Sequence, residues 1–337
     1  MTPFRDAVVL GPGNLGERQM KKVGHKCIPE FIEEEFISAV ETVISNAVYP
    51  RHFIEISRVS QDEEHGVGYD GVINSFVPFY LQFKRSTFHT PQFDGKTAKD
   101  RAACGYGNRN GFFSFTLHKD RVSKGYDQHN KLFALQQQFS TAYVAPLFYR
   151  KNALSQYKLL TPGFAWSYQN LNIATAANPR YPVALIDVRI FHETMTIPPH
   201  APVTDHLPSH EYSYSHNGDI CFHSKATPTD GPRKTLYDLL AGILHSLVES
   251  QTPLHVQSLA VIEMLPKVFS AEWKSRLFRS MLKSYMVELD ILPAGWNGDL
   301  PHFLSNDLGT AARLMLSEAV LWGELRIAQY VARIRKA

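Results

Sequence analysis

Apolar side chains in the first third of the chain recur at intervals of three and four residues. The positions concerned are Ile32, Phe36, Ala39, Val40, Val43 and Ala47. This spacing places them on one face of a helix, which we predict over residues 30–47 and expect to end before Pro50. The apolar face of this helix requires a sheet or another helix to cover it.

The pattern after this helix changes to the two-residue period of strands. His52–Arg58 alternates apolar and polar side chains, and Tyr69–Asn74 and Val77–Lys84 are also rich in strand-forming residues. We predict that these three strands form a meander. An insertion over about 86–125 follows, and Phe112–Leu117 within it is a further candidate strand.

A helix over Asp127–Phe139 and an apolar strand over Tyr143–Phe148 complete an order of helix, three strands, helix, strand. This order predicts an α/β fold with a mixed sheet.

The second half of the chain has a different character. Val183–Phe191 predicts a strand, and Glu211–His223 predicts a hairpin that turns at Asn217-Gly218. Apolar spacing then predicts four helices, over residues 234–249, 255–264, 271–290 and 307–335. We therefore divide the chain into an N-terminal arm (1–28), an α/β domain (29–150) and a domain of a β-hairpin and helices (151–337).

Composition agrees with a folded protein, since 44% of the 337 residues are hydrophobic and 20% are charged. The apolar stretches are too short to cross a bilayer, and the N-terminus lacks the pattern of a secretory signal. We expect no contact with a membrane and a cytoplasmic location. Cys27, Cys104 and Cys221 are odd in number and far apart, which predicts neither a disulfide framework nor a structural zinc site and fits a reducing compartment.

Basic residues are concentrated in one stretch. Between Lys84 and Lys124 there are nine Lys or Arg and three Asp. A phosphate backbone and a solvated basic loop account for this excess about equally well. The candidate nucleic-acid contacts are Arg85, Lys96, Lys99, Arg101 and Arg109.

Three polar residues form the pattern with the clearest chemistry. Gln82 and Lys84 stand two apart in an apolar strand and therefore point the same way. A hairpin between this strand and the one before it would bring Asp70 near them. An Asp carboxylate and a Gln carbonyl oxygen can bind a divalent cation, and Lys can orient a water or offset charge on a phosphate.

The segments Gly68-Tyr69-Asp70 and Gln82-Phe83-Lys84, with the predicted helix before them and helix and strand after them, resemble the PD-(D/E)xK nuclease superfamily in its Gln variant. The resemblance covers about a third of the chain. It implies a restriction-endonuclease-like core and a Mg²⁺- or Mn²⁺-dependent endonuclease that hydrolyses phosphodiester bonds, with DNA favoured over RNA. It also implies a role in bacterial antiviral defence, alone, as a homodimer or in a complex with a partner protein.

In families of this kind a Glu on the first helix often completes the metal site. Glu33, Glu34 and Glu35 are adjacent here, and at about 100° per residue Glu33 lies nearest the apolar face. The resemblance thus assigns Asp70, Gln82, Lys84 and Glu33 to catalysis, and Asp70, Gln82 and Glu33 to the metal.

Other interpretations remain open. Gln82 and Lys84 are also compatible with a solvated edge strand. The domain can equally be a non-catalytic, nuclease-like subunit that binds nucleic acid or a partner. Gly11–Gly16 matches the GxGxxG dinucleotide fingerprint, but the helix that should follow is short and poorly apolar, and the next segment is the helix containing Glu33 rather than a strand. Five His in residues 200–223 match no metal motif, which favours a polar loop and hairpin.

Overall fold

The computed structural model describes residues 25–49, 54–59, 73–119, 125–159, 184–185, 188–204, 209–223, 227–228, 234–249, 254–292, 296 and 298–335. Asp70 and the GxGxxG segment lie outside the described residues. Within them the protein is a mixed α/β structure with two main sheets, so the predicted class is confirmed at this level.

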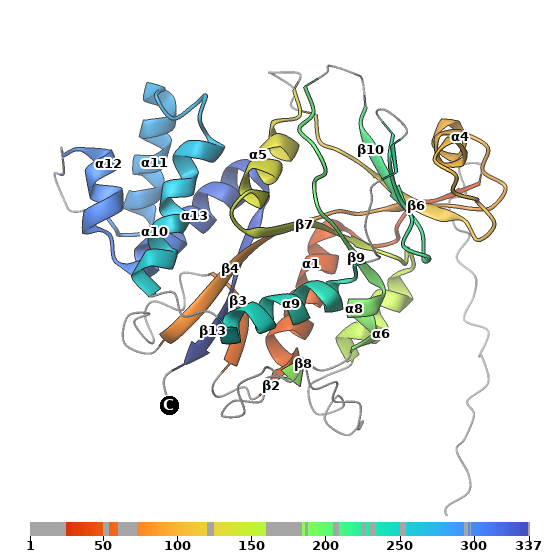
Figure 1. Ribbon diagram of the computed structural model, residues 1–337, viewed down its shortest axis with the longest axis horizontal. Helices are drawn as coiled ribbons and strands as arrows, with labels where there is room; N and C mark the ends of the chain where they lie inside the picture. Colours follow the sequence, from red (N-terminus) through yellow and green to blue (C-terminus); the bar gives the residue numbers. More distant parts are fainter. Residues whose placement is uncertain are drawn as a thin grey trace, which may run out of the picture.

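The central sheet has five strands in the order β3 (Ile54–Arg58), β13 (Ala328–Arg335), β4 (Ile73–Phe83), β7 (Ser140–Pro146) and β9 (Thr194–Ile197). β4 and β7 are parallel, and the other neighbours are antiparallel. Figure 1 shows the C-terminal strand β13 lying beside β4, from the first third of the chain. The sheet therefore combines residues from before and after residue 150.

Two predictions about these strands are wrong. Residues 73–83 form one continuous strand, so no hairpin separates Asn74 from Val77. Pro78 does not break this strand because pairing with β7 begins only at Phe79. In addition, the helix predicted over 307–335 ends at Leu325, where Arg326 has a left-handed backbone with φ 54°, and β13 follows. β13, rather than a neighbour in a meander, lies between β3 and β4.

The second sheet is antiparallel, in the order β1 (Lys26–Cys27), β5 (Thr87–His89), β6 (Phe112–Thr116), β10 (Glu211–Tyr214), β11 (Ile220–Phe222) and β12 (Thr227–Pro228). The predicted insertion therefore pairs with the predicted hairpin. The hairpin is confirmed, with a longer turn than two residues, since Ser215 still bonds to Asp219 and Gly218 has φ 88°. The strand predicted over 183–191 is confirmed in part. In the described part of this range, Ala184–Leu185 forms β8 and pairs with β2 (Val48–Tyr49), whereas the prediction is wrong from Arg189 on, where α8 (Arg189–His192) is helical.

Helices cover both faces of the central sheet. One face packs against α1 (Glu33–Ala47), α6 (Lys151–Leu159), α8 and α9 (Leu236–Glu249). The other packs against α5 (Asp127–Gln136), α10 (Leu254–Val268) and α13 (Thr310–Leu325), and α11 (Arg276–Glu288) packs on α13. A short helix α12 (Leu300–His302) and a π-helical turn η1 (Phe303–Asp307) precede α13, and α4 (Lys96–Ala103) lies beside the second sheet (Figure 1). None of the helices in these described ranges is long and apolar enough to cross a membrane.

The alternation of side chains along β4 sets the position of the polar residues. Phe79, Leu81 and Phe83 are buried in the core under α1 and α9. Tyr80 points to the opposite face, among the residues packed against α5, α10 and α13. Gln82 therefore points to that second face, at the end of the strand.

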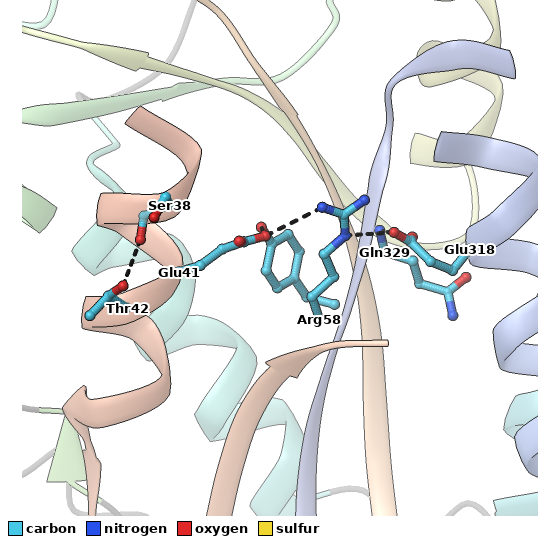
Figure 2. A network of polar contacts seen from close by, with 7 residues as sticks. Ser38, Glu41, Thr42, Arg58, Glu318 and Gln329 are labelled. Atoms are coloured by element: carbon cyan, nitrogen blue, oxygen red, sulfur yellow. Dashed lines mark hydrogen bonds and ion pairs between the residues drawn. The ribbon is translucent and has the colours of Figure 1, made fainter. Parts of the chain in front are cut away.

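A polar network joins β3, β13, α1 and α13 (Figure 2). Arg58 Nε donates to Glu318 Oε1 at 2.6 Å, and a second Arg58 nitrogen lies 3.6 Å from Glu41. The other Glu318 oxygen accepts the Gln329 backbone N–H at 2.6 Å. Burial nevertheless raises the pKa of Glu318 to about 8. This carboxyl connects α13 to the strand that follows it.

Replacing Glu318 with alanine should destabilise the protein by about 2–4 kcal/mol. The change leaves Arg58 without its main partner and a buried backbone N–H without an acceptor; Arg58 is 24% exposed, which keeps the cost below that of a fully buried pair. Urea unfolding measures the difference. The control is Glu288→Ala, an exposed position on α11, where a change within about 0.5 kcal/mol is expected. Equal stability of both variants would contradict this role of Glu318.

Candidate functional site

A cavity of about 540 Å³ lies where the end of β4 meets α1, α5, α11 and α13. Its walls are formed by Glu33, Gln82, Lys84, His118, Asp127, Gln128, Lys131, Phe269, Glu272, Phe278, Gly323, Glu324, Leu325 and Arg326. Three residues that the sequence analysis selected, Glu33, Gln82 and Lys84, thus line the same cavity.

Gln82 is 1% exposed and has a fixed orientation. Its Nε2 donates to the backbone carbonyl of Leu325, near the end of α13, at 3.1 Å. The carbonyl can only accept, so the amide nitrogen must face it and Oε1 must point elsewhere. This buried Oε1 has no hydrogen-bond partner among the described residues. An unpaired buried acceptor is costly, which makes Gln82 Oε1 a candidate ligand atom.

Lys84 extends into the same cavity. Its Nζ donates to Gln128 Oε1 at 3.4 Å and lies 5.7 Å from the centre of the Tyr143 ring. Gln128 Nε2 in turn donates to the carbonyl of Leu325, the same acceptor that holds Gln82. Burial lowers the pKa of Lys84 to about 8, although the nearby Glu33 acts in the opposite direction.

The three glutamates at the start of α1 lie in different surroundings. Glu33 is partly buried on the cavity wall, and Glu34 is exposed. Glu35 binds Lys151 at 2.7 Å and accepts the backbone N–H of Ile32. Burial raises the pKa of Glu33, although Lys84 and Arg85 act to lower it. Of the three, Glu33 is therefore the one positioned to act together with Lys84.

The cavity wall carries side chains of both charges. The first turns of α1 and α5 border it with Glu33 and Asp127, and helix N-termini attract negative charge. Its walls carry four carboxylates (Glu33, Asp127, Glu272, Glu324) against three cations (Lys84, Lys131, Arg326). A divalent cation would reverse this slight acidic excess.

The remaining catalytic candidate, Asp70, cannot be assigned a contact, since it lies outside the described residues. The hairpin that was expected to bring it near Gln82 is absent. The eleven residues of β4 instead separate the beginning of this strand from the cavity by roughly 35 Å.

The predicted nucleic-acid contacts lie in two kinds of environment. Lys96, Lys99 and Arg109 are exposed. Arg85 is also exposed, and together with Lys26 it lines a second cavity of about 480 Å³.

The prediction that Arg101 contacts nucleic acid is wrong. Its side chain is fully buried under α4 and donates to Ser213 Oγ at 2.9 Å. A guanidinium enclosed in this way cannot reach a phosphate backbone, so Arg101 is a structural residue.

Sequence reasoning missed Gln128 and Arg326, which complete the cavity. Gln128 follows Asp127 in the first turn of a helix that was predicted, and this position was the available signal. Nothing in the sequence indicates Arg326, because it reaches the cavity only through the packing of α13 on the sheet.

Two histidines of the segment 200–223 bond to hydroxyl groups of the second sheet. His200 bonds to the Tyr212 hydroxyl at 2.6 Å, and His223 bonds to Ser213 Oγ at 2.6 Å. Across the described ranges, no group of three or more His, Cys, Asp or Glu side chains could hold a metal ion. Among the described residues, a metal ion in the first cavity would therefore have fewer than three His, Cys, Asp or Glu ligands.

Comparison with known proteins gives no family for this chain: it matches no protein-family model, no curated protein and no solved structure.

Proposed function

We propose that the protein is a Mg²⁺-dependent nuclease whose active site is the first cavity. The observation that carries this proposal is the convergence of Glu33, Gln82 and Lys84 on one cavity from α1 and β4. Nuclease chemistry requires oxygen ligands for a metal and a positive charge near the phosphate, and these three side chains provide both.

The donor set fits Mg²⁺ in part. The Glu33 carboxylate and the unpartnered Gln82 Oε1 are hard oxygen ligands, and Mg²⁺ commonly keeps several waters beside one or two carboxylates. Bound there, Mg²⁺ would polarise a phosphoryl oxygen and lower the pKa of a water.

The chain's own residues have separate roles in this proposal. Lys84 carries the positive charge that offsets charge developing on the phosphate. Gln128 holds Lys84 in position through its Oε1, and the Leu325 carbonyl fixes both Gln82 and Gln128. The exposed Arg85, next in sequence to Lys84, is suited to bind the neighbouring backbone phosphate.

The test is cleavage of supercoiled plasmid, linear duplex DNA, single-stranded DNA and RNA with Mg²⁺ or Mn²⁺. Glu33→Gln should lower the rate by about 100-fold or more, because even outer-shell partners of a metal contribute about 10- to 100-fold. Glu34→Gln is the matched control, an exposed neighbour outside the cavity wall, and should cleave like the wild type. Equal rates for both variants would place the chemistry elsewhere.

A second candidate is a nuclease-like subunit that binds nucleic acid without cutting it. The finding that favours it is the lack, among the described residues, of three or more grouped His, Cys, Asp or Glu ligands. Salt-dependent DNA binding with no cleavage of any substrate by the wild type would support this candidate over the nuclease.

A further inference from the structure

Two cysteines that are far apart in the sequence meet beside the second sheet. Cys104 follows the last turn of α4, and Cys221 lies in β11. Their Sγ atoms are 2.9 Å apart. A disulfide bond is about 2.05 Å long, so the two sulfurs need to approach by only roughly 1 Å to be bonded.

The packing of α4 explains why the two thiols meet. Thr97 Oγ1 donates to Glu211 Oε2 at 3.0 Å, and Arg101 Nη1 donates to Ser213 Oγ at 2.9 Å. Thr97, Arg101 and Cys104 are spaced by four and three residues, which places them on one face of the helix. The contacts of the first two residues with β10 therefore direct Cys104 toward the sheet.

The sheet positions the second thiol. Ser213 on β10 is the cross-strand partner of Cys221 on β11. The two side chains stand next to each other on one face of the sheet, and Arg101 binds the first of them. Because these contacts, of which that of Arg101 is buried, hold α4 against the β10–β11 hairpin, the fold itself brings the two sulfurs together.

We propose that Cys104 and Cys221 are a redox modification site that forms a reversible disulfide when the protein meets hydrogen peroxide. This inference is independent of the proposed nuclease function. It goes beyond the expectation from sequence, which predicted neither a disulfide framework nor a structural zinc site for the three cysteines.

The environments of the two thiols assign their order of reaction. Cys104 is partly exposed and Cys221 is buried, and burial raises the pKa of the Cys221 thiol. The Cys104 sulfur thus attacks peroxide, which breaks the O–O bond, gives a sulfenic acid and releases one water. The Cys221 sulfur then attacks the Cys104 sulfur, and the hydroxyl leaves with the Cys221 proton as a second water. Two thiols and one peroxide become one disulfide and two waters.

The bond would tie α4 to β11 across more than a hundred residues of chain. Closing so long a loop restricts the unfolded chain and stabilises the folded one. The bond would thereby hold α4, which carries the exposed Lys96 and Lys99, more firmly against the second sheet.

The test uses the full-length protein, treated with a small excess of hydrogen peroxide and then digested without reduction for mass spectrometry. We expect one cross-linked pair of peptides containing Cys104 and Cys221, lost after treatment with dithiothreitol. The oxidised protein should melt about 5 °C higher than the reduced protein. Cys27→Ser is the matched control and should retain both effects, whereas Cys104→Ser should lose both.

The inference is overturned if all three thiols still titrate in denaturant after peroxide treatment, or if the cross-link contains Cys27. The wild-type mass measurement decides this without any variant, so a failure of Cys104→Ser to fold does not affect the result. Oxidation of Cys104 to a sulfinic acid without a cross-link would equally overturn it.

Discussion

A Lys84→Met variant should lose cleavage activity and yet be more stable than the wild type. Removing a single group that stabilises transition-state charge typically costs about 10²- to 10³-fold in rate. Methionine keeps much of the length of the side chain and its apolar contacts but removes the charge. Loss of activity without loss of structure would therefore separate chemistry from folding.

The gain in stability follows from the pKa of Lys84, which burial lowers from its usual value to about 8. Below pH 8 the folded protein keeps a charge that costs more in the cavity than in the unfolded chain. This cost is on the order of 1–3 kcal/mol at pH 7. Between about pH 8 and 10.5 the unfolded chain binds more protons at this residue, so the wild type should gain stability as pH rises, and the variant should lack this gain.

Cleavage of plasmid and thermal unfolding at pH 7 and pH 9.5 measure both expectations. Lys267→Met is the matched control, because Lys267 is exposed on α10 and does not line the cavity. It should change neither property appreciably. A Lys84→Met protein that cleaves at the wild-type rate would exclude Lys84 from the reaction. A Lys84→Met protein that is less stable than the wild type at pH 7 would show that the charge of Lys84 stabilises the folded protein.

Residues 29–150 expressed alone should fail to fold. In the whole protein β13 pairs with β3 on one side and with β4 on the other. Without it β3 has no strand partner in the described structure, and β4 keeps only β7. The apolar face of α1 would also lose Ala328, Tyr330 and Ala332 from its core.

Circular dichroism and the dispersion of amide signals in NMR spectra measure this outcome. The control is residues 25–335, which keep every described strand and should unfold cooperatively. A monomeric 29–150 fragment with a sharp unfolding transition would contradict the requirement for β13 and would support an independent α/β domain.

Part of the candidate site could be predicted from local sequence patterns. Helical spacing singled out Glu33 among three adjacent glutamates, and the two-residue period of a strand placed Gln82 and Lys84 on one side. Both are consequences of backbone geometry, which a sequence carries directly. The hairpin expected between Asn74 and Val77 was wrong because both residues belong to one continuous strand, in which Pro78 pairs with β13 and lies before the pairing with β7.

Contacts between distant segments depend on tertiary packing and could not be predicted from local patterns. Arg101 was expected at the surface because it lies in a basic stretch, but the packing of α4 on β10 buries it beside Ser213. Cys104 and Cys221 gave no signal of a pair, because their meeting depends on the pairing of the β10–β11 hairpin with β6 and on the position of α4.

The sequence by itself determined most helices and strands, the mixed α/β class and the faces on which Glu33, Gln82 and Lys84 lie, because these depend on the spacing of apolar residues. Only the tertiary structure decided that β13 lies between β3 and β4, that α13 closes the cavity and that two thiols meet. The physical reason is that strand pairing and burial depend on the packing of all segments of the folded chain, so the pattern of a short segment does not specify which distant segment it contacts.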